Sequence, residues 1–552
     1  MTRATRGSLS ALPCLLLVAA LLVGAPLDAQ ITEIVDISPD NSDHDPIDPD
    51  GATGGRVTGI VVDPTDGSVL YAASEWGGIY KTVDAGLTWQ KLDGHRPTAT
   101  WDVAIDPSNT DRVYATSFYD GRETSQSQSG INVSTDGGAT WTHPASANPP
   151  GGLCINPADE TERTAFGISI DPTNNANVYV GTSCGLAFST DSGATWSYEA
   201  PPAGGDRMWD VMVSADGSFV DTCGDSGHWV MDTTTMDWSQ SPTQQLPSGR
   251  CSLAASPYDQ GNRFAVVSTT IYEANSAGEW TETRDNPTPQ GRIPFVATNP
   301  RSTAPAGDIF DLWFGDVSLF QVACDRTNTP SCGTGNSPPW NGPYTRDVGG
   351  HDDMGDIAFD PLAGNDACPI LMSSDGGVYW NTETTSPDCH SPEWEQPDVT
   401  PHGLWPFGMG GSDRPGAVAE DLYFGNQDNG IFGTLDAGAA KPDWDNEICC
   451  DGFDAGADDF DDGTVLYSVC CFGGGKPTRY FLTGPKFAGG GEINYPPGLQ
   501  PSFKFPDSYF NFEDQKWVLI TRGASGGVFV THNIDEQPIE WIELGAATKP
   551  PT

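Results

Sequence analysis

The sequence predicts an all-β protein, a single β-propeller of about ten four-stranded blades with Asp-box turns, with seven or eight blades as the alternative. A unit of roughly fifty residues recurs along the chain, and three copies keep the same closing octet in register. Within the units, short β-branched runs alternate with Asp-Gly or Gly-Gly turns, which is typical of antiparallel strands. Repeats that each form a small sheet indicate a closed ring of blades.

The clearest unit runs from Gly55 to Trp89. Its runs 57–62 and 69–73 predict two antiparallel strands, and Gly77-Gly78 turns the chain into a third at 79–81. Further copies follow to about residue 541, with a weaker pattern in the middle of the chain.

Each strong unit closes with the pattern S/T-x-D-x-G-x-T-W, the Asp-box. Its Asp carboxylate can accept backbone N–H bonds across a tight turn, Gly can take the left-handed conformation, and Trp can pack on the sheet. We therefore expect a structural role for four aspartates: Asp84, Asp136, Asp191 and Asp436. Asp375 is excluded from this set because its Gly-Gly-Val-Tyr aligns with Gly77-Gly-Ile-Tyr80 and places it in the preceding turn.

The ends of the chain predict export. Arg3 and Arg6, an apolar run and Ala29 resemble a secretory signal peptide spanning 1–29. We expect an acidic segment at 30–54 that closes the last blade, the propeller at 55–545 and a short tail at 546–552. Later apolar segments are much shorter than the roughly 20 residues of a membrane span.

Charge and cysteine content narrow the partners. With 75 acidic and 26 basic residues the net charge is −49, which excludes a general affinity for nucleic acid or anionic membranes. No cofactor is expected beyond a possible structural Ca²⁺ at the acidic cluster that includes Asp458, Asp459 and Asp461. Twelve cysteines remain after the signal peptide, which predicts disulfides between neighbours: Cys154–Cys184, Cys223–Cys251, Cys324–Cys332, Cys368–Cys389 and Cys449-Cys450 with Cys470-Cys471.

Strand parity predicts the functional face. The loops between strands two and three share one face with the blade-to-blade connections, and the Asp-box turns lie on the other. Three loops each place a carboxylate on that face, and these three residues are the candidate catalytic groups: Glu75, Asp375 and Asp428. It also gathers candidate ligand-binding side chains: Trp76, Trp101, Trp209, His351, His402, Trp405 and Arg522. Aromatic faces mixed with carboxylates suit a sugar or a peptide.

The boxes, the I-x-x-D-P strand ends and Asn426-Gln-Asp-Asn-Gly430 resemble the Asp-box propellers, which include sortilin-type ectodomains, bacterial sialidases and xyloglucan-hydrolysing glucanases. A single ring of about ten blades resembles the sortilin type most closely. Arg292-Ile293-Pro294 is similar to a sialidase motif, but it stands in mid-chain and we interpret it as coincidence. Residues 54–141 resemble the first two glucanase blades, and that family's catalytic Asp falls on Glu75. The family's second carboxylate comes from another lobe, which this chain looks too short to contain.

The sequence indicates three functions, of which the first is our main prediction, the second is the alternative and the third ranks last. The first is a secreted propeller that binds an extracellular glycan or polypeptide. The second is a glycoside hydrolase acting on β-glucan or xyloglucan-like polysaccharide, with Glu75 and either Asp375 or Asp428 as its two carboxyls. The third is a structural role in a surface assembly.

Overall fold

The computed structural model describes most of the chain from Gly54 to Glu447 and the strands beyond it. The described residues are 38–39, 54–122, 126–240, 245–256, 262–275, 278–300, 308–344, 352–362, 371–381, 394–410, 422–427, 429–439, 442, 444–447, 452–460, 463–470, 477–482, 487–492, 508–511, 516–522, 528–531 and 540–543. For 453–531 only the backbone is described. The predicted signal peptide, the tail and all of the predicted acidic segment 30–54 except residues 38, 39 and 54 lie outside these residues, as do Asp428, His351, Asp461 and the cysteines 368, 389, 449, 450 and 471.

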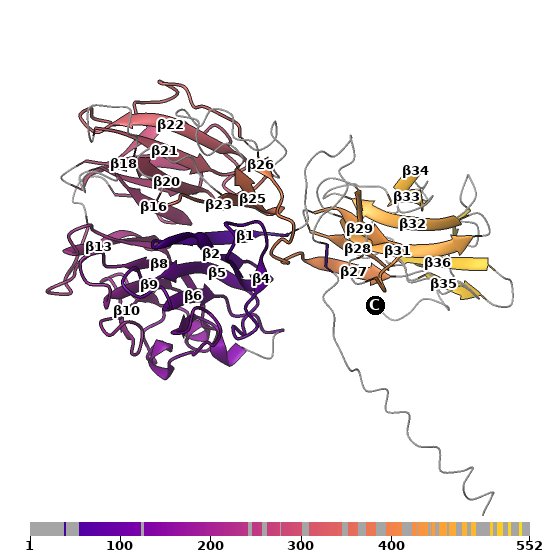
Figure 1. The fold of residues 1–552 in the computed structure, drawn as a ribbon, viewed down its shortest axis with the longest axis horizontal. Helices are drawn as coiled ribbons and strands as arrows, with labels where there is room; N and C mark the ends of the chain where they lie inside the picture. Colours follow the sequence, from indigo (N-terminus) through magenta and orange to yellow (C-terminus); the bar gives the residue numbers. More distant parts are fainter. Residues whose placement is uncertain are drawn as a thin grey trace, which may run out of the picture. The chain divides into compact units, whose positions relative to one another are not determined.

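Within the described residues the strands form ten antiparallel sheets, eight of four strands and two of three (Figure 1). The first four sheets take consecutive strands: β1 (Val57–Asp63), β2 (Asp66–Ser74), β3 (Gly78–Thr82), β4 (Gln90–Lys91); β5 (Thr100–Ile105), β6 (Val113–Ser117), β7 (Ile131–Ser134); β8 (Ala165–Ile170), β9 (Val178–Thr182), β10 (Gly185–Ser189), β11 (Ser197–Glu199); β12 (Met208–Val213), β13 (Phe219–Gly224), β14 (Gly227–Asp232), β15 (Trp238–Ser239). Three short 3-10 helices lie among them: η1 (Gln126–Gln128), η2 (Ala145–Ala147) and η3 (Pro157–Glu160).

The next three sheets keep the same consecutive order: β16 (Cys251–Ala255), β17 (Arg263–Val267), β18 (Thr270–Ala274), β19 (Trp280–Arg284); β20 (Phe295–Pro300), β21 (Ile309–Gly315), β22 (Leu319–Asp325); β23 (Met354–Ala358), β24 (Leu371–Ser374), β25 (Gly377–Asn381), β26 (Trp394–Glu395). The last three are: β27 (Pro406–Gly410), β28 (Leu422–Asn426), β29 (Ile431–Thr434), β30 (Asp445–Glu447); β31 (Gly452–Phe460), β32 (Gly463–Cys470), β33 (Pro477–Leu482), β34 (Phe487–Glu492); β35 (Ser508–Asn511), β36 (Lys516–Arg522), β37 (Val528–Thr531), β38 (Ile542–Glu543).

The first seven sheets close into a ring. The first strand of each sheet contacts the first strand of the next, and β23 of the seventh returns to β1 (Figure 1). One cavity of about 210 Å³ is lined by residues from, or directly before, all seven of these strands. It therefore lies on the axis of the ring, and we call it the axial cavity.

The propeller fold is confirmed, and ten sheets match the expected number of units. They do not form one ring of ten, because seven already close on one another and the seven-blade alternative describes that ring. The three further sheets follow in series, with β27 against β31 and β31 against β35.

Apolar side chains on alternate strand positions seal each junction between blades. At the closing junction Val57 and Leu70 of the first sheet pack with Leu371 and Val378 of the seventh in one buried cluster. Trp89, which ends the first octet, is 4% exposed in the same cluster. Burial of each such side chain stabilises the folded protein by about 1.5–3 kcal/mol. The junction that closes the ring is thus held by the same kind of apolar packing as the other junctions between blades.

The octets form the expected tight turns after the third strands. Asp136 accepts hydrogen bonds from Thr140 N at 2.8 Å and Thr140 Oγ1 at 2.6 Å, and Trp141 Nε1 donates to Gly138 O. Asp84 and Asp191 repeat this set with Thr88 and Thr195, and Asp436 accepts from Thr434 Oγ1 at 2.7 Å. These turns lie at the ends of the third strands that are opposite to the loop holding Glu75.

Three aspartates join neighbouring first strands across the axial cavity wall. The Oδ2 atoms of Asp102, Asp210 and Asp356 accept the N–H groups of Ile168, Leu253 and Ile60 at 3.0, 2.8 and 2.9 Å. Their Oδ1 atoms accept the N–H of the following residue. Each carboxyl thus ties its own sheet to an adjacent one, β5 to β8, β12 to β16 and β23 to β1.

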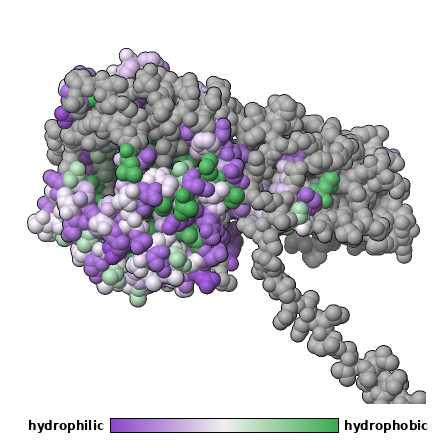
Figure 2. Space-filling model, viewed as in Figure 1, coloured by the Kyte–Doolittle hydropathy of each residue, from purple (hydrophilic) through white to green (hydrophobic). Residues whose placement is uncertain are grey.

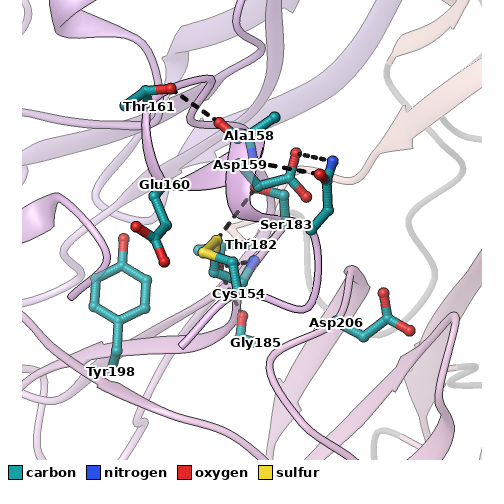
Figure 3. Close-up of a disulfide and its surroundings, with 12 residues drawn as sticks. Cys154, Ala158, Asp159, Glu160, Thr161, Thr182, Ser183, Gly185, Tyr198 and Asp206 are labelled. Atoms are coloured by element: carbon teal, nitrogen blue, oxygen red, sulfur yellow. Dashed lines mark hydrogen bonds between the residues drawn. A yellow bond between two sulfur atoms is a disulfide. The ribbon is translucent and has the colours of Figure 1, made fainter. Parts of the chain in front are cut away.

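Three of the expected disulfides are confirmed: Cys154–Cys184, Cys223–Cys251 and Cys324–Cys332. Figure 3 shows Cys154 near the turn that carries Ala158 and Thr161, where Thr161 Oγ1 donates to Ala158 O. The second bond links β13 to the start of β16, so it fixes two blades together beside the axial cavity. The other predicted pairs lie at least partly outside the described residues.

On the face in view, the described surface is mostly hydrophilic, with apolar residues in small groups (Figure 2). This agrees with the acidic composition of the chain. In the part of the chain that is described, no helix has the length and apolar character to cross a bilayer.

Candidate functional site

Glu75 and Asp375 line the same pocket, of about 180 Å³. It lies at the ends of strands where the parity argument places the functional face. The lining residues come from six connections between strands and from the segment before β1: Arg56, Glu75, Trp76, Arg292, Ile293, Asp353, Asp375, Gly403, Trp405, Gln427 and Asn429. We call it the carboxylate pocket.

Glu75 follows β2 and is held by its backbone. Its N–H donates to Arg56 O at 2.8 Å, and the chain then turns through Gly77 and Gly78. A Cβ on Gly77 would lie 2.3 Å from His402 O, and Gly78 has φ +88°, so both positions require glycine. Burial raises the pKa of Glu75 above its usual value, although the charge of Arg56 acts against this shift. Glu75 thus retains a proton at higher pH than an exposed glutamate.

Asp375 occupies the corresponding turn between β24 and β25, as the sequence alignment predicts. Its N–H donates to Asp353 O at 3.2 Å, and its carbonyl accepts Asn429 Nδ2 at 2.7 Å. Arg56 connects the two acids: Nε lies 3.6 Å from Glu75 Oε2 and Nη1 lies 3.8 Å from Asp375 Oδ2. One guanidinium therefore holds both carboxyls within roughly 10 Å, the scale on which paired carboxyls act in glycoside hydrolysis.

Trp76 and Trp405 form an aromatic wall beside the acids. Their ring centroids are 4.7 Å apart at 38°, and the Arg122 guanidinium lies 5.5 and 5.6 Å from the two rings. The two tryptophans thus lie together at the carboxylate pocket, and their role in binding stays a prediction. His402 lies beside them in sequence, but its ring faces Tyr80 edge-on and its carbonyl accepts the Tyr80 hydroxyl at 2.8 Å. His402 is not among the residues that line the carboxylate pocket.

Trp101 and Trp209 lie instead at the axial cavity, which shares Ile293 with the carboxylate pocket. They stand near the starts of β5 and β12, with ring centroids 5.9 Å apart. The Arg250 guanidinium stacks on both, 4.6 Å from Trp101 and 4.9 Å from Trp209. The faces of both rings thus contact Arg250, which was not among the residues predicted from the sequence.

Sequence reasoning missed three of the arginines around these pockets, Arg56, Arg122 and Arg250. A signal existed for two of them, because Arg56 and Arg250 each directly precede the first strand of a blade. Arg207 precedes β12 in the same way. The tripeptide interpreted as coincidence also places Arg292 and Ile293 in the carboxylate pocket.

The remaining predicted residues are not tested. Asp428 and His351 lie outside the described residues, although Gln427 and Asn429 on either side of Asp428 line the carboxylate pocket. Arg522 ends β36, where only the backbone is described. Asp458 and Asp459 lie in β31 and Asp461 falls outside the described residues, so the Ca²⁺ site stays a prediction.

No family model matches the chain. Curated relatives include the xyloglucanase Xgh74A of Acetivibrio thermocellus, 32% identical over 169 residues, which cover 29% of this chain and 20% of the relative. A xyloglucanase of Hypocrea jecorina is 26% identical over 251 residues, which cover 43% and 27% of the two chains. The matches thus span about a fifth to a quarter of these relatives' lengths.

Two solved structures have a similar fold. An ancestral GH74 enzyme superposes with a TM-score of 0.62 at 14% identity, covering 92% of this chain and 72% of that chain. The GH74 xyloglucanase from Xanthomonas campestris gives 0.60 at 16% identity, covering 89% and 74%. At these identities the likeness supports the propeller fold alone.

Proposed function

We propose that the protein is an extracellular glycoside hydrolase that acts on a β-glucan or xyloglucan-like polysaccharide at the carboxylate pocket. The observation that carries the proposal is a partly buried Glu75 with a raised pKa, joined through Arg56 to a second carboxyl and placed beside a wall of two tryptophans. The xyloglucanase relatives supply the class of substrate.

Glycosidic bond cleavage needs one carboxyl that is protonated and one that is ionised. Burial favours the neutral form of Glu75, which suits it to donate a proton to the leaving oxygen. Asp375 or Asp428 then acts on the opposite side of the sugar, as the base for a water or as the nucleophile. Trp76 and Trp405 offer an apolar surface for a pyranose ring, and this orients the bond toward Glu75.

The test is the release of reducing ends from xyloglucan and from linear β-glucans. Glu75→Gln keeps the shape of the side chain but cannot deliver the proton, so we expect kcat to fall by about 10²–10⁴ while binding persists. Glu282→Gln is the matched control, since Glu282 lies in β19 and lines neither pocket. It should keep wild-type turnover.

Glycan binding without turnover is the competing function, and it has support in the structure. Arg56 lies within 4 Å of both acids, an arrangement that also suits a static binding site. If the wild type binds these polysaccharides but releases no reducing ends, the pocket is a binding site and the hydrolase proposal is wrong. Turnover that survives Glu75→Gln would also overturn the role given to Glu75.

A further inference from the structure

Arginines gather at these pockets although the chain is strongly acidic. The protein has only 26 basic residues against 75 acidic ones, yet four arginines lie at blade-to-blade connections around the two cavities: Arg56, Arg207, Arg250 and Arg292. Each stands directly or closely before the first strand of a blade. The same two cavities are also lined by six carboxyls, those of Glu75, Asp353 and Asp375 in one and of Asp102, Asp210 and Asp356 in the other, so each arginine has to be considered with its own neighbours.

Three of the four are balanced by carboxylates of the protein. Arg56 faces Glu75 and Asp375, Arg207 Nη1 lies 3.5 Å from Asp225 Oδ2, and Arg292 Nε lies 3.7 Å from Asp353 Oδ2. Arg250 differs, because no carboxylate among the described residues lies within ion-pair distance of it. Arg250 Nη1 donates a hydrogen bond to Arg292 O at 3.2 Å.

Arg250 is also held rigidly. Trp101 and Trp209 flank its guanidinium, and the following residue, Cys251, is bonded to Cys223 of the neighbouring sheet. Trp209 is fixed in turn by a hydrogen bond from Nε1 to Asp225 Oδ1 at 2.9 Å. A planar guanidinium that is already oriented loses little conformational entropy when it binds a carboxylate.

Donors on two of these arginines have no acceptor from the described protein. Arg250 Nε is buried and makes no hydrogen bond, and the same holds for Arg56 Nη2. Burial and the nearby charge of Arg56 lower the pKa of Arg250 to about 10, so it stays charged at neutral pH. Buried donors without acceptors are uncommon in native proteins, and each of them requires an explanation, such as a bound water, ion or ligand group that accepts the hydrogen bond.

We propose that Arg250, together with Arg56, binds the carboxylate of an acidic saccharide, a glycan that bears a uronic acid, where the carboxylate pocket meets the axial cavity. The two cavities share Ile293, so one sugar chain can reach both. A carboxylate matches the planar donor pattern of a guanidinium. In a uronic acid this carboxylate is attached to the pyranose ring, so it lies next to the ring that the tryptophans contact. The proposal deepens the proposed function and rests on its pocket being the glycan site.

The test compares two disaccharides that differ only in one carboxylate: cellobiouronic acid, which is glucuronosyl-β-1,4-glucose, and cellobiose. Calorimetric titration at low ionic strength is expected to show that cellobiouronic acid binds at least about 10-fold more tightly than cellobiose. This is the gain in affinity expected from one charge-assisted hydrogen bond. Added NaCl should weaken the binding of cellobiouronic acid but not that of cellobiose. Acetate alone, as a third ligand, should bind far more weakly than the uronic acid. Equal binding of acetate would assign the site to small anions and overturn the saccharide proposal.

Arg250→Gln should abolish the preference for the acid, and Arg326→Gln should retain it. Arg326 is the matched control because it pairs with Asp308 at 2.9 Å and lines neither cavity. If Arg250→Gln does not reach the native fold, Arg250→Lys replaces it, and its loss of the planar fork should reduce the preference. A wild type without preference, or a variant with unchanged preference, overturns the inference. Hydrolysis is read separately as reducing ends, so failure of the proposed function and failure of this inference can be told apart.

Discussion

Arg56 sets the balance of charge between the two acids of the carboxylate pocket. It lies 3.6 Å from Glu75 and 3.8 Å from Asp375, and it is 12% exposed at its side chain. Burial raises the pKa of Glu75, and Arg56 limits that rise because its positive charge favours the ionised carboxylate. Its removal should therefore strengthen the proton affinity of Glu75 rather than weaken it.

We expect Arg56→Gln to shift the alkaline limb of the kcat/KM profile for xyloglucan to higher pH. A general acid acts only while it is protonated, and Glu75 without its cationic neighbour remains protonated at higher pH. Arg326→Gln, with the same loss of charge away from the pocket, should leave the limb in place. A limb that stays fixed or moves to lower pH in Arg56→Gln would exclude Glu75 as the acid.

The first strands of the blades carry a second group of acids with a different task. Burial raises the pKa of Asp102 to about 6, of Asp210 to about 7 and of Asp356 to about 8. Each lines the axial cavity but is surrounded by protein, and each still accepts two backbone N–H groups. The folded pKa values exceed that of an unfolded aspartate, which is about 3.9. These groups therefore make their full contribution to the stability of the folded protein below about pH 3.9. Their contribution is lost as pH rises through 6 to 8.

Asp356→Asn tests this pH dependence. At pH 5 the variant loses one of two accepted N–H bonds and should be destabilised by about 1–3 kcal/mol. At pH 9 the wild type itself buries an ionised carboxylate. The difference in the free energy of unfolding between wild type and variant should therefore be smaller than at pH 5. Urea unfolding at both pH values measures it. Asp360→Asn is the control, since Asp360 accepts one bond from the exposed Leu362 N and lies outside the axial cavity. A difference that grows with pH would contradict the raised pKa.

Local patterns in the sequence were sufficient for the turns and the strands. The octets at Asp84, Asp136 and Asp191, the Gly77-Gly78 turn and three cysteine pairs each depend on neighbours along the chain, so composition and spacing predict them. Strand parity likewise brought Glu75, Asp375, Trp76 and Trp405 to one pocket, because alternate loops of a meander lie on the same face.

Interactions between distant segments could not be predicted in the same way. The position of Arg250 before a first strand is visible in the sequence, but its contact with Trp101 and Trp209 from other blades is not. Ring closure also depends on the angle between adjacent sheets, which a strand pattern does not encode. The ten units therefore predicted ten blades, whereas the contact of β23 with β1 closes seven.

Across the protein, the ring determines where a ligand can bind. All seven first strands line the axial cavity, and the carboxylate pocket combines Glu75, Trp76 and Asp375 of the ring with Trp405, which directly precedes the eighth sheet. The octet turns project from the opposite ends of the third strands. We therefore propose that glycan binding and cleavage take place on one face of the protein.

The most direct test is a crystal structure of the Glu75→Gln variant with a bound xyloglucan oligosaccharide, because this variant should bind without cleaving. The account predicts a glucosyl ring against Trp76 and Trp405, with a glycosidic oxygen within hydrogen-bond distance of the residue 75 side chain. An oligosaccharide bound at the octet turns, or elsewhere beyond reach of residue 75, would contradict it.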